Sequence, residues 1–230
     1  MSIDVLALFA SRMAGGYALC LALFGPMVRQ GAWRSVSLFT IAGIAVCAFA
    51  AGAPALPALA TAGAALILQR ALQYDLKGAS PLWIGPFGFW LVWAAEPKGP
   101  GLDSYPSAIA VGGTLGAMLL GHSYLTARGL SFTPLKRMAV LLFWILVLRA
   151  AFAAPAYFGD ALEMMDWVFL SMRGALGLAL PLVLAWMVLQ CVKIESNQSA
   201  TGILYAMTAL VGMFGELVAA YLKLERGIPA

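Results

Sequence analysis

Four ionisable side chains lie inside long apolar segments of the chain, and they are Arg12, Arg149, Arg173 and Glu216. Charged groups are costly in apolar surroundings, where they usually mark internal pairing or a functional site. Counted from the predicted ends of their segments, all four lie in one layer, about two helical turns below the outer membrane surface. Because a guanidinium fork suits carboxylate and phosphate groups, this layer predicts a site for a negatively charged group.

Glu216 is expected to point into the helix bundle, on the face that it shares with Tyr205 about three turns earlier. A buried carboxylate needs a cation, and Arg149 and Arg173 are the candidate partners. Together with Arg12, these residues make up the predicted ligand-binding site.

Two interpretations of this polar layer stay open. In the first it is a structural salt-bridge network, in which Arg12 extends its stem to the outer surface and Arg173 leans toward Asp166. In the second the surplus of positive charge favours an anionic or amphipathic ligand that enters from the outer side. Haem propionates, a lipid headgroup, an organic anion and a quinone oxygen all fit that description.

His122 is the only histidine of the chain, and it lies with Tyr124 near the predicted inner surface. An imidazole with an ordinary pKa of about 6.5 can donate to a quinone oxygen or relay a proton. The alternative is a hydrogen-bonded histidine at the membrane interface. One histidine excludes a bis-histidine haem within this chain, whereas His–Met ligation needs a methionine from another helix.

Enzyme signatures are missing from the sequence. It contains no HExxH, GxSG, Walker A, GxGxxG or DxxD lipid-transferase pattern. The buried ionisable groups are also too few and too cationic for most acid–base schemes. We predict no catalytic residue and no metal ligand, and a function other than catalysis is favoured.

The amino-acid composition predicts an integral membrane protein. Of 230 residues, 63% are hydrophobic and 10% are charged, whereas a soluble domain has about 25% charged residues. The net charge of +4 comes from basic residues at the ends of apolar segments, not from a stripe, so nucleic acid is not an expected partner. The expected partner is the lipid bilayer, with other membrane subunits as a second class.

The apolar segments predict an all-α polytopic helix bundle, with residues 1–230 forming a single transmembrane domain and no separate soluble domain. Segment 79–95 is short and contains Pro86, so the alternative to eight spans is seven spans with a re-entrant fourth segment. The eight predicted spans are 5–26, 36–53, 57–74, 79–95, 105–127, 137–157, 164–192 and 198–222.

Loop charge predicts the orientation. Lysines and arginines concentrate in alternate loops, which the positive-inside rule places in the cytoplasm. Eight spans with both termini outside fit this alternation, whereas seven spans would divide the basic loops between the two sides. The pattern is typical of a bacterial inner (cytoplasmic) membrane protein. The basic loops are 27–36, 70–77, 128–137 and 193–198.

Three functional hypotheses follow. The first is binding or transport of a small anionic or amphipathic molecule at the outer polar layer. The second is a membrane subunit of an electron-transfer complex, associated with quinone or haem. The third is a structural or assembly subunit of a membrane complex without a ligand. No cofactor is predicted outside the second hypothesis.

Overall fold

The computed structural model describes residues 2–28, 40–41, 43–44, 79–96, 99–126, 131–158 and 162–228. Within these ranges every regular element is a helix, which confirms the all-α class. The elements are α1 (Ile3–Phe24), η1 (Gly25–Met27), α4 (Ala79–Ala94), α5 (Ser104–Thr126), α6 (Thr133–Ala153), η2 (Ala154–Phe158), α7 (Met164–Met172), η3 (Arg173–Ala179), α8 (Leu180–Lys193), α9 (Asn197–Ala209), η4 (Leu210–Leu217) and α10 (Val218–Glu225).

Five helices in the described part of the chain are long and apolar enough to cross a membrane. They correspond to the first and the last four of the predicted spans. The fourth predicted span is α4, whose 16 residues extend about 24 Å, less than the roughly 30 Å of a hydrocarbon core. The second and third predicted spans lie, apart from residues 40–41 and 43–44, outside the described residues. The five helices are Ile3–Phe24, Ser104–Leu125, Thr133–Phe158, Met164–Lys193 and Asn197–Glu225.

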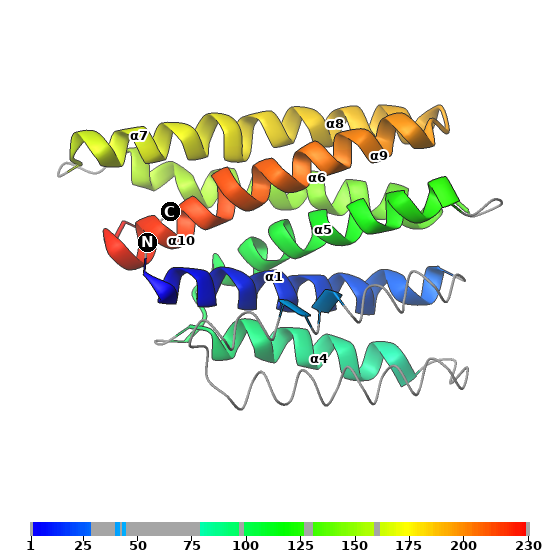
Figure 1. Ribbon diagram of the computed structural model, residues 1–230, viewed down its shortest axis with the longest axis horizontal. Coiled ribbons are helices and arrows are strands. Elements are labelled where there is room, and N and C mark those ends of the chain that lie inside the picture. Colours follow the sequence, from blue (N-terminus) through cyan, green and yellow to red (C-terminus); the bar gives the residue numbers. More distant parts are fainter. Residues whose placement is uncertain are drawn as a thin grey trace.

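The described helices run side by side along the longest axis of the molecule (Figure 1). Helix α1 packs against α4 and α5, and α5 also packs against α6 and α9. Helix α8 contacts α6 and α9. Both termini lie at one end, where the backbone N–H of Ser2 donates to Glu225 Oε1 at 2.5 Å. We call this end the N/C end.

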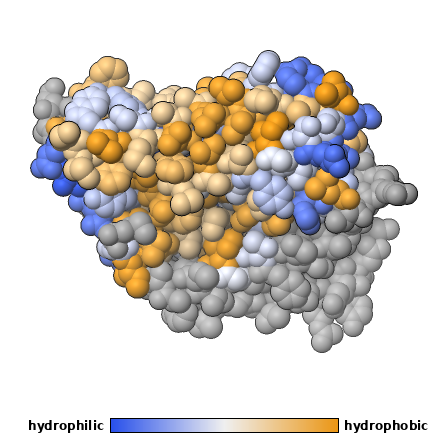
Figure 2. All heavy atoms as spheres, turned by 45° about the horizontal axis from the view of Figure 1, so that its top comes forward, coloured by the Kyte–Doolittle hydropathy of each residue, from blue (hydrophilic) through white to orange (hydrophobic). Residues whose placement is uncertain are grey.

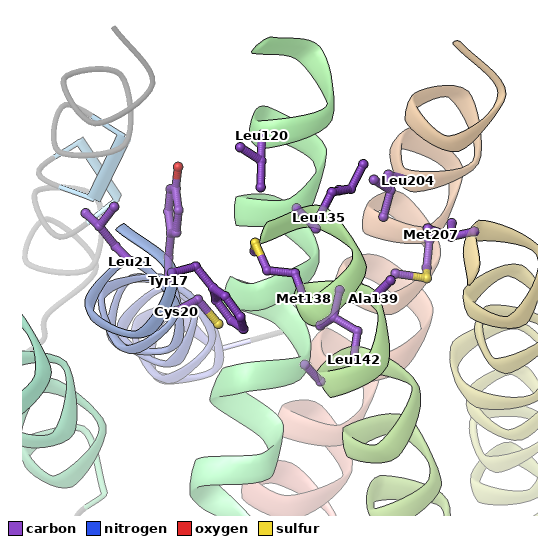
Figure 3. Packing of buried hydrophobic residues seen from close by; sticks show 14 of the residues in the cluster. Tyr17, Cys20, Leu21, Leu120, Leu135, Met138, Ala139, Leu142, Leu204 and Met207 are labelled. Carbon is purple, nitrogen blue, oxygen red and sulfur yellow. The ribbon is translucent and has the colours of Figure 1, made fainter. Parts of the chain in front are cut away.

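Apolar side chains from α1, α5, α6 and α9 form the main core (Figure 3). The buried face of α6 repeats at intervals of three or four residues, as a helix packed on one side requires. Leu142, Leu146 and Arg149 follow one another on this face, and all three are buried. The periodicity of α6 therefore places Arg149 at a core position.

The outward side chains form an apolar surface. Trp144, Val183 and Trp186 on α6 and α8 are each more than half exposed. Figure 2 shows apolar residues in a band across the molecule, with hydrophilic residues toward its two ends. A band of this kind fits a membrane protein, whose middle section faces lipid.

Glycines bring α1 and α5 into backbone contact. A Cβ atom on Gly16 would lie 1.7 Å from the carbonyl oxygen of Ala108, and one on Gly112 would lie 2.1 Å from the nitrogen of Tyr17. Small residues at such crossings let helices approach closely in lipid. The contact holds the N-terminal part of α5, which contributes to the polar layer, against α1.

Two wider, π-helical turns interrupt the last two long helices. Segment η3 lies between α7 and α8, and η4 lies between α9 and α10. At the end of η3 the backbone N–H of Leu180 donates to Ala175 O, five residues earlier. The two segments cross at Gly177 and Gly215, where a Cβ on Gly177 would lie 2.5 Å from Gly215 Cα. Single π turns often occur at functional sites, so this crossing is a candidate location.

Candidate functional site

The four ionisable residues predicted to share a layer are all buried, with exposed fractions between 0% and 2%. The crossing of η3 and η4 supplies two of them, because Arg173 lies one turn before Gly177 and Glu216 follows Gly215. Helix α6 supplies Arg149 and helix α1 supplies Arg12. The sequence prediction that distant segments place charges together therefore agrees with their placement in the fold.

Arg149 and Glu216 form a two-pronged ion pair. Arg149 Nε donates to Glu216 Oε1 and Nη2 donates to Oε2, both at 2.8 Å. Paired charge-assisted hydrogen bonds of this kind are stronger than neutral ones and fix the relative orientation of both groups. Glu216 thus has the cation that its burial requires.

Ser107 joins this pair to Arg12. The Ser107 hydroxyl donates to Glu216 Oε2 at 2.5 Å and accepts from Arg12 Nη1 at 2.9 Å. Arg12 in turn donates to Glu96 through Nε, at 3.1 Å, and through Nη2. Arg12 therefore does not extend to the surface as the structural interpretation expected, because Glu96 meets its guanidinium inside the fold.

Glu96 lies where this buried chain of polar groups reaches the N/C end. Its Oε2 accepts from Lys223 Nζ at 3.2 Å, and its Oε1 accepts from the Ser104 hydroxyl at 2.9 Å. Burial by itself raises the pKa of Glu96, but the charges of Arg12 and Lys223 and the donated hydrogen bonds outweigh it, so the pKa is lowered. The Glu96 carboxylate is thus held in its ionised form.

This lowered pKa predicts a loss of stability in acid. The ionised Glu96 contributes its full stabilisation above the unfolded-state pKa of about 4.3, and the contribution disappears as pH falls through the lower folded value. The wild-type thermal midpoint should therefore fall between pH 7 and pH 3, and Glu96→Gln should show a smaller fall. The exposed Asp4→Asn variant, at the same end, is the matched control. Equal pH slopes for wild type and Glu96→Gln would contradict the prediction.

Arg173 differs from the other buried arginines. Its side chain is 0% exposed, and its Nε, Nη1 and Nη2 have no hydrogen-bond partner among the described residues. Arg149 Nη1 is also buried, and no described group accepts a hydrogen bond from it. Glu216 attracts Arg173 and Arg149 repels it, but Glu216 makes its hydrogen bonds with Arg149 and Ser107 instead. Arg173 therefore presents unused donors inside the protein.

Asp166, the other partner considered for Arg173, is engaged elsewhere. Its two oxygens accept from Arg226 Nε at 2.7 Å and Nη2 at 3.1 Å, and Arg226 Nη2 also meets Glu163 Oε2. The hydrogen bonds that Arg226 donates to Asp166 and Glu163 raise the pKa of Arg226 above its usual range. This cluster ties the end of α10 to the start of α7 and leaves Arg173 out.

The structure does not bring Tyr205 to the site. Tyr205 is 44% exposed and its hydroxyl lies 3.2 Å from His122 Nδ1. Eleven residues, about 16 Å along the helix, separate it from Glu216. The predicted common face assumed regular α-helical spacing, and the wider turns of η4 shift that phase. Tyr124, near His122 in sequence, donates to Ser131 O at 2.5 Å and stacks on Phe132.

Four participants of this network were not predicted from the sequence, namely Glu96, Ser104, Ser107 and Lys223. Glu96 and Lys223 follow the ends of apolar segments, where they resemble ordinary loop charges. Ser104 and Ser107 at helical spacing in an apolar segment were the available signal, because buried hydroxyls need polar partners.

The chain matches no protein-family model, no curated protein sequence and no solved structure. Its function is therefore inferred from the geometry of the site itself.

Proposed function

We propose that this chain is an integral membrane protein that binds or translocates a small anionic or amphipathic ligand at Arg149, Arg173 and Glu216. Eight spans with both termini outside, in a bacterial inner membrane, are part of the proposal. The apolar band of Figure 2 and the five long apolar helices support the membrane setting. The alternation of basic loops supports the orientation.

The observation that supports ligand binding best is the guanidinium of Arg173, which has no hydrogen-bond partner within the described ranges. Buried polar groups almost always have hydrogen-bond partners, and a buried charge without one is destabilising. Arg149 and Arg12 have carboxylate partners, whereas Arg173 has none among the described side chains. A purely structural network of salt bridges would be expected to give Arg173 a carboxylate partner as well. An anion that binds at Arg173 supplies the missing acceptors and the missing charge.

A direct test is thermal unfolding of the purified protein in neutral detergent with added benzoate, an amphipathic carboxylate. Binding at about 100 times Kd should stabilise the wild type by about 2.7 kcal/mol. Arg173→Gln should bind about 10- to 100-fold more weakly, since a charge-assisted hydrogen bond contributes about 1.5–3 kcal/mol. The exposed Arg137→Gln, at the opposite end of the bundle, should bind like the wild type.

Benzoate efflux from proteoliposomes then separates translocation from binding alone. Absence of stabilisation by benzoate and by every other anion tested would favour the third hypothesis, a structural subunit without a ligand.

The contact between His122 and Tyr205 favours quinone association as the second candidate. Both side chains are exposed on the α5–α9 face, far from the N/C end, and their polar atoms lie 3.2 Å apart. A phenol and an imidazole on an apolar surface can donate to the carbonyl oxygens of a quinone headgroup. Binding of a short-chain quinone that survives Arg173→Gln but not His122→Phe would support this candidate.

A further inference from the structure

The charge of the buried layer restricts the ligand that it can accept. The described buried groups at this site are three guanidiniums, of Arg12, Arg149 and Arg173, and two carboxylates, of Glu96 and Glu216. The half-buried rim adds one charge of each sign, on Lys223 and Asp103. One positive charge is left over. Because Arg12 and Arg149 each pair with a carboxylate, the remaining positive charge is that of Arg173.

The donors that remain suit an oxyanion. All three nitrogens of Arg173 and Nη1 of Arg149 lack a hydrogen-bond partner in the described part of the chain, so two guanidinium edges offer N–H groups. A planar fork of N–H donors matches two oxygens on one atom better than it matches a spherical halide. Glu216 holds Arg149 in place by accepting hydrogen bonds from the other two nitrogens of Arg149, Nε and Nη2.

Tyr157 lies beside this site, at the surface of the protein. It lies on η2 and is partly exposed, and its hydroxyl donates to Leu170 O at 2.7 Å, one turn before Arg173. A Cβ on Gly174 would lie 2.4 Å from the same hydroxyl, so the phenol rests directly on the turn that holds Arg173. A phenol has a single O–H proton, so Tyr157 becomes a third donor for a ligand at Arg173 when its hydroxyl turns from Leu170 O to that ligand.

From these observations we infer that Arg173, with Arg149 Nη1 and the Tyr157 hydroxyl, forms a site for one monovalent oxyanion group per chain. This inference rests on the proposed function and adds the charge and geometry of the ligand. One negative charge neutralises the layer, whereas a second would leave an uncompensated negative charge inside the protein, which is costly. The group is the carboxylate or nitrate-like head of a soluble anion, or the phosphodiester of an anionic lipid.

Isothermal titration of the protein in neutral detergent tests the charge selectivity. Nitrate and formate should bind to the wild type, and sulfate and chloride should bind at least 10-fold more weakly. Arg173→Gln should weaken nitrate binding about 10- to 100-fold, as it does benzoate binding, and Tyr157→Phe should weaken nitrate binding about 3- to 10-fold without changing the preference for nitrate over sulfate. If Arg173→Gln does not fold, Arg173→Lys keeps the charge without the fork, and it should lose the preference for nitrate over chloride.

Nanodiscs distinguish the two sources of the oxyanion. If the ligand is a lipid, phosphatidylglycerol should stabilise the wild type relative to phosphatidylcholine, and Arg173→Gln or Arg173→Lys should reduce that difference. If the ligand is soluble, nitrate should stabilise equally in both lipids. Sulfate binding as tight as nitrate binding would overturn this inference while leaving the proposed function intact. No binding of benzoate, nitrate, formate or phosphatidylglycerol would overturn both.

Discussion

Arg149→Gln should destabilise the protein strongly, whereas Arg173→Gln should not destabilise it. Removal of one partner from a buried ion pair costs about 3–5 kcal/mol, because the other charge is left uncompensated. Arg149→Gln leaves Glu216 without its two 2.8 Å hydrogen bonds and should be destabilised by this amount. Arg173→Gln removes a buried charge that has no described partner, so its stability should equal or exceed that of the wild type.

Thermal unfolding in neutral detergent, without added anion, measures both differences. The double variant Arg149→Gln/Glu216→Gln is the control for the pair, because it removes both charges together. It should recover most of the stability lost in Arg149→Gln. If Arg173→Gln proves as unstable as Arg149→Gln, then Arg173 is paired in the folded protein and the proposed anion site loses its main support.

A stable or stabilised Arg173→Gln that no longer binds anions would show that Arg173 is retained for function at a cost in stability, a common relation at binding sites. This outcome separates the two interpretations of the polar layer. A salt-bridge network predicts that every arginine stabilises the fold, whereas a ligand site predicts one arginine that does not.

The five long helices of the described part were predictable because their length and apolar composition follow from the thickness of a bilayer. The predicted segment 105–127 and helix Ser104–Thr126 differ by one residue at each end. The pairing of Arg149 with Glu216 was also predictable in kind, since a buried carboxylate needs a cation. The first inference uses the sequence of one helix at a time, and the second uses only the rule that a buried charge needs an opposite charge.

Neighbour relations were not predictable in the same way. Arg12 pairs with Glu96, 84 residues later in sequence, because α1 packs between α4 and α5. Tyr205 lies at His122, about 16 Å along the helix from Glu216, and the wider turns of η4 remove the common face that regular helical spacing predicted. One sequence does not specify the order of helices around a bundle or the position of a π turn, and both decide which polar groups meet.

Gly16→Ala should have the second large effect on stability. The added methyl would lie 1.7 Å from the carbonyl oxygen of Ala108, which is backbone and cannot rotate away. Helices α1 and α5 must therefore separate, and overpacking of this kind typically costs about 1–3 kcal/mol. We expect a cost at or above the upper end of that range. Arg12 on α1 and Ser107 on α5 move apart together with their helices, which also strains the 2.9 Å hydrogen bond between them.

Gly202→Ala in α9 is the matched control, since a Cβ there meets nothing within 4 Å. It should be neutral or stabilising by up to about 1 kcal/mol, as alanine is favoured over glycine inside helices. Thermal unfolding of both variants in neutral detergent measures the difference, and anion titration of Gly16→Ala reports the displacement of Arg12 and Ser107. A Gly16→Ala protein as stable as Gly202→Ala would mean that α1 and α5 do not meet at Gly16 and Ala108. In that case the hydrogen bonds that join Arg12 to Glu216 through Ser107 would lose their structural basis, because the close approach of these two helices brings the three side chains together.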